Sequence, residues 1–302
     1  MSLGLPAGVA QAAEKGAGLA KCDLVSLMVG EFPELQGEMG HAYALAQGVA
    51  PDVAEVIRDH YRPKGAADET AATPAGALVA IADRLDTLAG CFAIGLTPTG
   101  AADPYALRRA CLGVLRTVLD RGWALRLDEA FGLAFDGFAG VKLDLGRDEL
   151  VKKLVDFAGE RLPNLLEGQL PADAVRAALG ARWAHPGDAR ARAEALAKLD
   201  GATRGQVGEV FKRASNIAEK AEGTTGEVRV PPRDVHPSEE KLVAAFRELA
   251  GAIEAHEKAP ERDWASVLTR IGGIAPVMAT YFEDVFVMAE DAEARALSLI
   301  HI

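Results

Sequence analysis

The sequence predicts an all-α protein made of two helical parts. Apolar residues make up 49% of the 302 residues, which is enough for a substantial core, and aromatic residues only 6%. Alanine and leucine predominate, and this favours helix packing over sheets. Apolar residues also recur at helical spacing along much of the chain. A chain of this length holds one large domain or two ordinary ones. We expect domains at 1–122 and 147–302, joined by a connector at 123–146.

The clearest pair of helices lies between residues 73 and 116. Thr73 can cap the first helix, and Pro74 suits its first position. After a connector rich in glycine and proline, Asp103 and Pro104 repeat this signal. The first helix has an apolar face formed by Leu78, Ile81, Ala82, Leu85, Leu88, Ala89 and Phe92. The second has one formed by Leu107, Ala110, Cys111, Val114, Leu115 and Val118.

Shorter elements precede and follow this pair. The patterns before it predict a helix within 1–29, a turn or broken helix at 30–39, and helices at 41–46 and 52–61. Residues 128–145 alternate only partly and contain several glycines, so we expect a connector there and no strand. The helices expected beyond it cover 147–167, 174–179, 189–199, 203–221, 239–258, 263–271 and a terminal segment from about 275 past 288.

Charge and cysteine usage restrict the class of protein. The net charge is −11 and the isoelectric point near 5.1, so the whole chain does not have the basic composition typical of nucleic-acid binding. Residues 181–215 nevertheless contain seven Lys/Arg against four acids, a local net charge of +3. Three cysteines without a CxxC motif indicate reduced thiols in a cytosolic protein. We see neither a signal peptide nor a membrane span and expect a cytoplasmic protein.

Two groups of polar side chains are candidates for phosphate contacts. Arg109 and Arg116 are two helical turns apart on the side away from the core face, and Arg108 lies at the edge of that face. Arginine can pair with phosphate through two parallel hydrogen bonds. The alternative is an ordinary solvated helix face with salt bridges. The second group occupies the polar face of the helix expected at 203–221 and contains Lys212, Arg213 and Asn216.

A third motif suggests a degenerate metal site. The run IADRLDTL, with Asp83, resembles the last acidic motif of HD-superfamily phosphohydrolases, which hold a metal with a His, a His-Asp pair and a final Asp. In this chain Cys22 and Asp23 stand where the His-Asp pair would lie. We therefore expect an HD-like scaffold without a metal, and the six histidines to be dispersed on the surface or in loops. A metal-dependent phosphohydrolase remains the alternative.

The longest resemblance is to the β subunit of bacterial heterotetrameric glycyl-tRNA synthetase. It is carried by LAKCDLVSLMVGEFPELQGEMGHAYALAQG and by ADRLDTLAGCFAIGLTPTGAADPYALRRACLGVLR. DPYALRR is the family's DPFALRR with Tyr105 in place of Phe. FKRASNIAEK is similar to KRVSNILKK of its anticodon-binding domain, with Ala214 for Val and Glu219 for Lys. The run PVMATYFEDVFVMAEDAEAR is also family-like.

This resemblance implies a role in tRNA binding. It implies that the chain is the C-terminal portion of a longer β subunit, with an HD-like helical domain at 1–122 and an anticodon-binding-type domain at 147–302. The chain would position tRNA(Gly) for aminoacylation by the α subunit, which holds ATP and Mg²⁺ in an α2β2 enzyme, and would itself have no catalytic site, metal or cofactor. The implied tRNA-binding residues are Arg108, Arg109, Arg116, Lys212, Arg213 and Asn216. A purely structural module that docks the α subunit is a further alternative.

Overall fold

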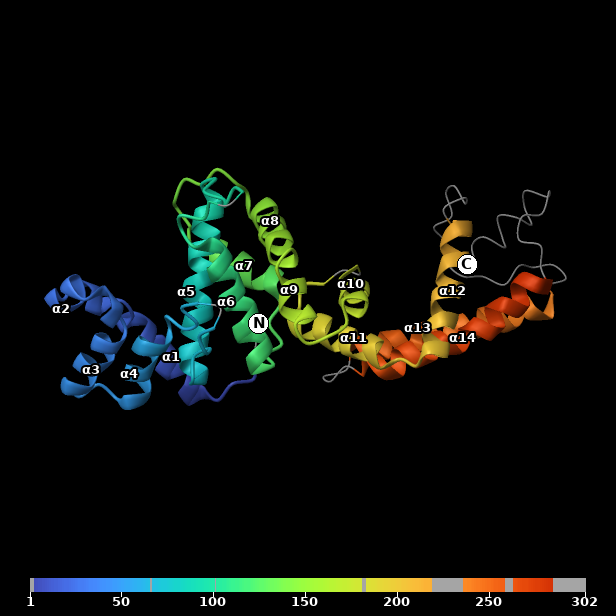
Figure 1. Cartoon of the computed structure of the whole chain (residues 1–302), viewed down its shortest axis with the longest axis horizontal. Coiled ribbons are helices and arrows are strands. Elements are labelled where there is room, and N and C mark those ends of the chain that lie inside the picture. Colours follow the sequence, from blue (N-terminus) through green and yellow to red (C-terminus); the bar gives the residue numbers. More distant parts are fainter. Residues whose placement is uncertain are drawn as a thin grey trace. The chain divides into compact units, whose positions relative to one another are not determined.

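The computed structural model describes residues 3–65, 67–100, 102–180, 183–218, 236–258 and 263–284. Within these ranges the chain is helical, and the one strand-like pairing is an isolated bridge between Thr99 and Ala102. The prediction of an all-α protein is thus confirmed. The chain forms two compact units, 1–190 and 191–302 (Figure 1). None of the described helices is both long and apolar enough to cross a membrane.

The first unit begins with several short helices. They are α1 (Ala7–Leu19), η1 (Cys22–Val25), α2 (Leu27–Glu31), η2 (Pro33–Leu35), α3 (Glu38–Ala46) and α4 (Pro51–Asp59). The helix expected within 1–29 is interrupted because Lys21 adopts a left-handed conformation, with φ of 66°, and Ser26 caps a new helix at Val29 N. Helix α1 packs on α4 at Gly16, where a Cβ atom would lie 2.5 Å from the Cβ of Val56.

Helices α5 (Pro74–Ala93) and α6 (Leu107–Arg121) form the predicted central pair (Figure 1). The hydroxyl of Thr73 accepts a hydrogen bond from Gly76 N at 3.1 Å, which confirms the predicted cap. Helix α6 begins later than expected because Ala106 adopts a left-handed conformation with φ of 56°. Asp103 still caps the helix, and its two carboxylate oxygens accept from Leu107 N at 2.8 Å and Arg108 N at 3.0 Å.

The rest of the first unit consists of α7 (Leu127–Asp136), α8 (Arg147–Gly159), α9 (Leu162–Glu167) and α10 (Ala172–Gly180). The segment expected as a connector contains α7, because Leu127, Ala130 and Phe131 share one face that is buried where α7 packs on α5 and α8. The single helix expected at 147–167 is divided into α8 and α9, and Pro163 in the first turn of α9 explains the break. The domain limits themselves stay a prediction.

The second unit contains α12 (Gly201–Ala218), α13 (Pro237–Lys258) and α14 (Trp264–Asp284), while α11 (Pro186–Lys198) spans the division between the units. Helix α14 unites the two C-terminal helices that we expected, and it continues through Pro276. Burial of Ile274, Met278 and Tyr281 against α13 outweighs the backbone hydrogen bond that the proline removes. The predicted loop at 222–237 lies mainly outside the described residues.

Candidate functional site

The DPYALRR motif forms the loop that leads into α6. Here the side chain of Arg108, half-buried, donates hydrogen bonds to the carbonyl oxygens of Gly100 at 2.6 Å and Ala102 at 3.2 Å. The Asp103 carboxylate accepts hydrogen bonds from the first two amide groups of the helix. Arg108 and Asp103 therefore fix the shape of this loop, and the helix terminus already binds a carboxylate from its own chain.

Two other side chains of the same motif face solvent. The ring of Tyr105 is 53% exposed, and Arg109 is exposed on the first turn of α6. Arg109 forms neither a hydrogen bond nor an ion pair with the residues that the structure describes. The motif thus exposes one aromatic ring and one guanidinium group that has no partner among the described residues. Both lie beside the start of α6, which Asp103 and Arg108 fix through hydrogen bonds.

Arg116 has a different environment, although it lies on the same helix. It is half-buried and donates to the carbonyl oxygens of Gly65 at 3.1 Å and Asp68 at 2.7 Å. Arg121 donates to the carbonyl of Ala71 in the same loop. Sequence spacing alone could not distinguish Arg109 from Arg116, because their spacing says nothing about a distant loop that folds over one of them.

Arg84 of α5 completes this set of contacts, although no sequence motif marks it as a candidate. Its guanidinium donates to the carbonyl oxygens of His60 at 3.0 Å, Tyr61 at 2.8 Å and Pro63 at 3.0 Å. Gly113 of α6 leaves room for it, because a Cβ atom there would lie 2.6 Å from Arg84 Nε. Burial lowers the pKa of Arg84, and the neighbouring Asp83 partly offsets this effect.

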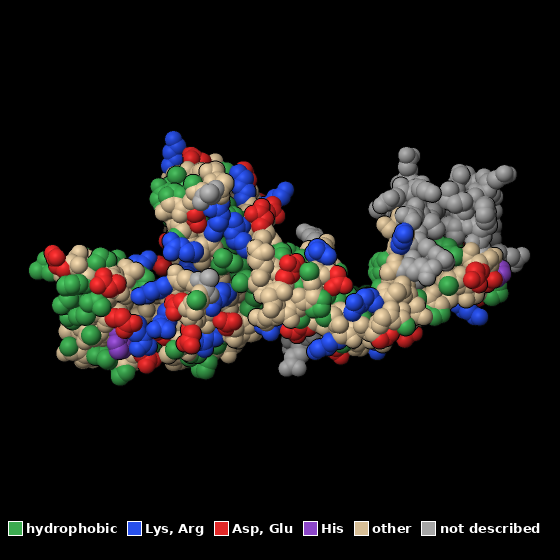
Figure 2. All heavy atoms as spheres, in the orientation of Figure 1, with side chains coloured by type: hydrophobic (Ala, Val, Ile, Leu, Met, Phe, Trp, Pro, Cys, Tyr) green, Lys and Arg blue, Asp and Glu red, His purple; other side chains and the backbone are tan. Residues whose placement is uncertain are grey.

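We call Arg84, Arg116 and Arg121, with the carbonyl groups they hold in residues 60–71, the arginine clamp. Figure 2 shows Lys and Arg side chains gathered over this part of the first unit. The arginine clamp keeps its positive charges, but its guanidinium N–H groups already donate hydrogen bonds to backbone carbonyl oxygens. Its arginines can therefore attract a polyanion at long range, whereas Arg109 can bond to one directly.

The degenerate HD-like positions come together around Tyr61. Asp23 is buried, and its Oδ2 accepts from Gly37 N at 2.6 Å and Gly40 N at 3.3 Å. Burial, and then the charges of Asp23 and Asp83, raise the pKa of Tyr61 to about 12. Cys22 is an exposed free thiol and lines a small cavity beside Asp23.

A cation of the chain itself balances Asp83. The ammonium group of Lys21 forms an ion pair with its carboxylate. The described residues contain no group of three His, Cys, Asp or Glu side chains that could hold a metal ion. His60 is fully buried, its Nδ1 lies 2.8 Å from Ile57 O, and burial lowers its pKa. The expectation of surface or loop histidines is therefore wrong for His60, which packs against the ring of Tyr61. It is also wrong for His256 of α13, which is buried against the ring of Trp264.

The hydroxyl of Tyr61 gives a testable consequence. It is buried and has no hydrogen-bond partner among the described residues, a state that costs about 1–3 kcal/mol. Tyr61→Phe should therefore raise the free energy of unfolding by about 1 kcal/mol in urea titrations at pH 7. Tyr43→Phe is the control, because that residue is 37% exposed and its hydroxyl is not a buried group without a partner. A destabilised Tyr61→Phe protein would show that the hydroxyl is hydrogen-bonded in solution.

The second polar group lies on α12. Lys212 is exposed there, beside Phe211, whose ring is 58% exposed. The backbone of Arg213 and Asn216 belongs to α12, but their side chains lie outside the part that the structure describes. Their role as tRNA contacts stays a prediction, and so does that of Lys212.

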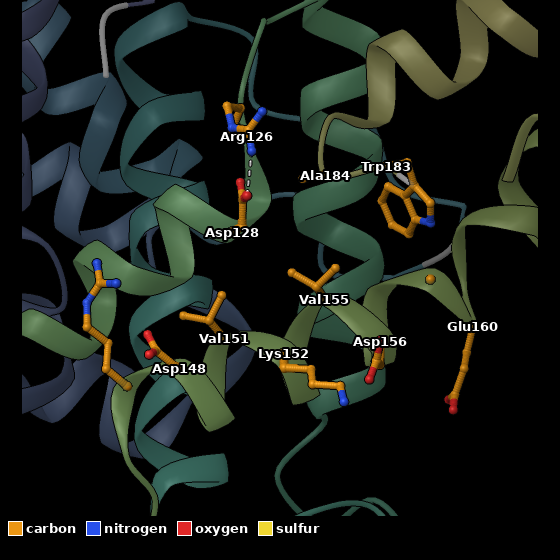
Figure 3. Close-up of a pocket in the computed structure, with 12 residues that line it drawn as sticks. Arg126, Asp128, Asp148, Val151, Lys152, Val155, Asp156, Glu160, Trp183 and Ala184 are labelled. Atoms are coloured by element: carbon orange, nitrogen blue, oxygen red, sulfur yellow. Dashed lines mark hydrogen bonds and ion pairs between the residues drawn. The ribbon is translucent and has the colours of Figure 1, made fainter. Parts of the chain in front are cut away.

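An open groove of about 1080 Å³ lies over α7 and α8 and near Trp183 (Figure 3). Its charged lining consists of Arg126, Arg147, Lys152, Asp128, Asp148, Asp156 and Glu160. Arg126 pairs with Asp128 at 2.5 Å, and Arg147 pairs with Asp136 at 3.0 Å. Acids outnumber bases in this lining, so the groove is a poor site for a polyanion.

Comparison with known proteins places the chain in one family. A protein-family model described as "Glycyl-tRNA synthetase beta subunit" matches residues 2–180. The glycine–tRNA ligase beta subunit of Anaeromyxobacter dehalogenans (strain 2CP-C) is 44% identical over 282 residues, which cover 92% of this chain and 40% of the relative. The same subunit of Geotalea uraniireducens (strain Rf4) is 40% identical over 293 residues, which cover 96% and 42%.

The beta subunit of Myxococcus xanthus (strain DK1622) is 41% identical over 295 residues, which again cover 96% of this chain and 42% of the relative. The chain thus spans about two fifths of the length of these curated relatives. The match extends through both compact units, well beyond the arginine-containing motif. The chain belongs to the glycyl-tRNA synthetase beta subunit family.

Proposed function

We propose that this chain binds tRNA within a cytoplasmic glycine–tRNA ligase and positions tRNA(Gly) for aminoacylation by the α subunit. Its relatives are named as beta subunits of that ligase, and it spans about two fifths of their length. In this proposal ATP and Mg²⁺ act on the α subunit of an α2β2 enzyme. This chain supplies contacts to the tRNA rather than bond-making groups.

The observation that carries this proposal is the exposed pair at the start of α6. The guanidinium of Arg109 has its donors available for a phosphate, and charge-assisted bonds of this kind are strong. The ring of Tyr105, 53% exposed, offers a surface on which an unpaired base can stack. The capped loop beneath them fixes their position, which reduces the entropy lost on binding.

A second contact is proposed on α12. The exposed Lys212 contributes positive charge in a segment, 181–215, whose local net charge is +3 in an otherwise acidic chain. Arg213 and Asn216 follow it in the family-like run and are assigned to the same contact. Such a strip adds phosphate binding that does not depend on base identity.

Arg109→Ala should weaken tRNA(Gly) binding about tenfold, because one charge-assisted contact with phosphate is lost. It should also reduce the slope of log K against log [salt] by about one. Filter-binding titrations at two or more salt concentrations measure both quantities. Arg176→Ala is the matched control, because Arg176 is exposed on α10 and forms no hydrogen bond or ion pair with described residues.

Equal affinities of the Arg109→Ala and Arg176→Ala proteins would remove Arg109 from the interface. Tyr105→Ala tests the stacking role, and it should weaken binding without changing the salt slope. Variants of Arg108 and Arg116 are less direct tests, because these side chains hold loops of the fold. Their tRNA affinities have meaning only after circular dichroism has shown that the variants are folded.

A further inference from the structure

An exposed apolar surface covers the end of the first unit that contains η1, α2 and α3. Val25 is 91% exposed and Leu27 is 89% exposed, although both are large apolar side chains on short helical segments. Others nearby in the sequence are 37–50% exposed, namely Leu19, Leu24, Met28, Phe32, Tyr43 and Leu45. Figure 2 shows hydrophobic side chains gathered over this end of the unit. We call these eight residues the apolar face.

A small cavity opens within the apolar face. It has a volume of about 200 Å³ and lies where the end of α1, η1 and α3 meet. Leu19 and Tyr43 belong both to the apolar face and to the lining of this cavity. This cavity is large enough for a single side chain of a partner. Side chains that fill such cavities near the centre of an interface contribute much of the binding free energy in many complexes.

Acidic side chains predominate along the η1–α3 side of the apolar face, while Lys15 and Lys21, the latter paired with Asp83, lie at its α1 edge. Between Lys21 and Arg58 the sequence contains no lysine or arginine. Glu31, Glu34 and Glu38 lie in the same segment and are exposed. A nucleic acid would meet repulsion here, whereas the arginine clamp and Arg109 lie in α5, α6 and the 60–71 loop.

We propose that the apolar face is the docking surface for a segment of another protein that presents apolar side chains flanked by lysine or arginine. Large exposed apolar patches on a soluble unit mark interaction sites. The acidic rim selects a basic partner by charge complementarity, which favours correct encounter and orientation. This inference is independent of the tRNA-binding proposal, because it uses a different surface and the opposite sign of charge.

The experiment is a fluorescence-anisotropy titration of the full chain with two labelled probe peptides. One peptide carries leucine on one helical face and lysine on the other, and its twin has glutamate in place of lysine. The wild-type protein should bind the lysine peptide saturably, and the glutamate twin at least about tenfold more weakly. Val25→Ser with Leu27→Ser should reduce affinity for the lysine peptide by a similar factor. Glu31→Gln with Glu34→Gln should reduce its salt dependence.

Leu133→Ser with Val141→Ser is the matched control, because these two side chains are 59% and 57% exposed and lie outside the apolar face. This control should bind like the wild type. Equal losses in Val25→Ser with Leu27→Ser and in Leu133→Ser with Val141→Ser, or equal binding of the two peptides, would overturn the proposal. So would concentration-dependent self-association that Val25→Ser with Leu27→Ser abolishes, since a second copy would then be the occupant.

Discussion

Arg84→Met should lower the free energy of unfolding of the first unit by about 3–4 kcal/mol. The guanidinium donates to the carbonyl oxygens of His60, Tyr61 and Pro63 at 2.8–3.0 Å and to Ala80 O at 2.8 Å. Methionine keeps much of the apolar stem but provides no donors. Carbonyl groups in the folded loop would then lose their partners, which is the costly way to remove a hydrogen bond.

Urea unfolding followed by tryptophan fluorescence can measure this loss in a Trp264→Phe background. Trp123 and Trp183 then report on the first unit alone. Arg84→Lys keeps the charge but not the planar guanidinium that reaches several carbonyl oxygens at once. It should therefore retain less than half of the stability that Arg84→Met loses. Arg176→Met, on an exposed position, should change stability by less than about 0.5 kcal/mol. If Arg84→Met unfolds no earlier than this control, the arginine clamp does not stabilise the fold.

Raising the pH from 9 to 12 should remove about 3 kcal/mol of stability through Cys111 alone. The thiol is 1% exposed, and burial raises its pKa from 9.0 to about 12. The unfolded chain therefore loses this proton at a lower pH than the folded chain. The stabilising contribution is complete below pH 9 and disappears as the pH rises towards 12.

Comparison with Cys111→Ala isolates this contribution from that of other groups that titrate at high pH. The variant should be slightly less stable at pH 8, because a buried sulfur atom is removed. Between pH 9 and 12 it should lose about 3 kcal/mol less than the wild type, as measured by urea unfolding at each pH. Parallel stability curves for the two proteins would show that the thiol ionises equally easily in both states.

Local signals predicted the central helices well. Thr73 and Pro74 mark the start of α5 correctly, because capping and proline geometry depend only on adjacent residues. Asp103 does accept hydrogen bonds from the first amides of α6, as a capping side chain would. The predicted start at Pro104 is wrong, however, because Ala106 in a left-handed conformation occupies the cap position and α6 begins at Leu107. An alanine in that conformation is unfavourable locally and is imposed by its surroundings, so sequence patterns do not reveal it.

Signals that depend on tertiary packing were harder to interpret. Helix α7 was missed because Leu127, Ala130 and Phe131 are interspersed with glycines, and only burial against α5 shows their common face. The two arginines of α6 that seemed equivalent, Arg109 and Arg116, differ because the 60–71 loop folds over one of them. Arg109 is the part of the candidate site that the sequence identified and that faces solvent unengaged.

The arginine clamp also affects how tolerant its loop is to change. Arg84, Arg116 and Arg121 hold carbonyl oxygens, which every amino acid possesses, so these contacts do not depend on the loop's side chains. Asp68 is the exception within the loop, because its carboxylate accepts hydrogen bonds from Lys64 N and Glu69 N. The exposed positions Lys64 and Glu69 can accordingly be exchanged, or converted to cysteine to attach a dye, while the backbone keeps its course. A reporter placed there would sit next to the cationic surface without disturbing it.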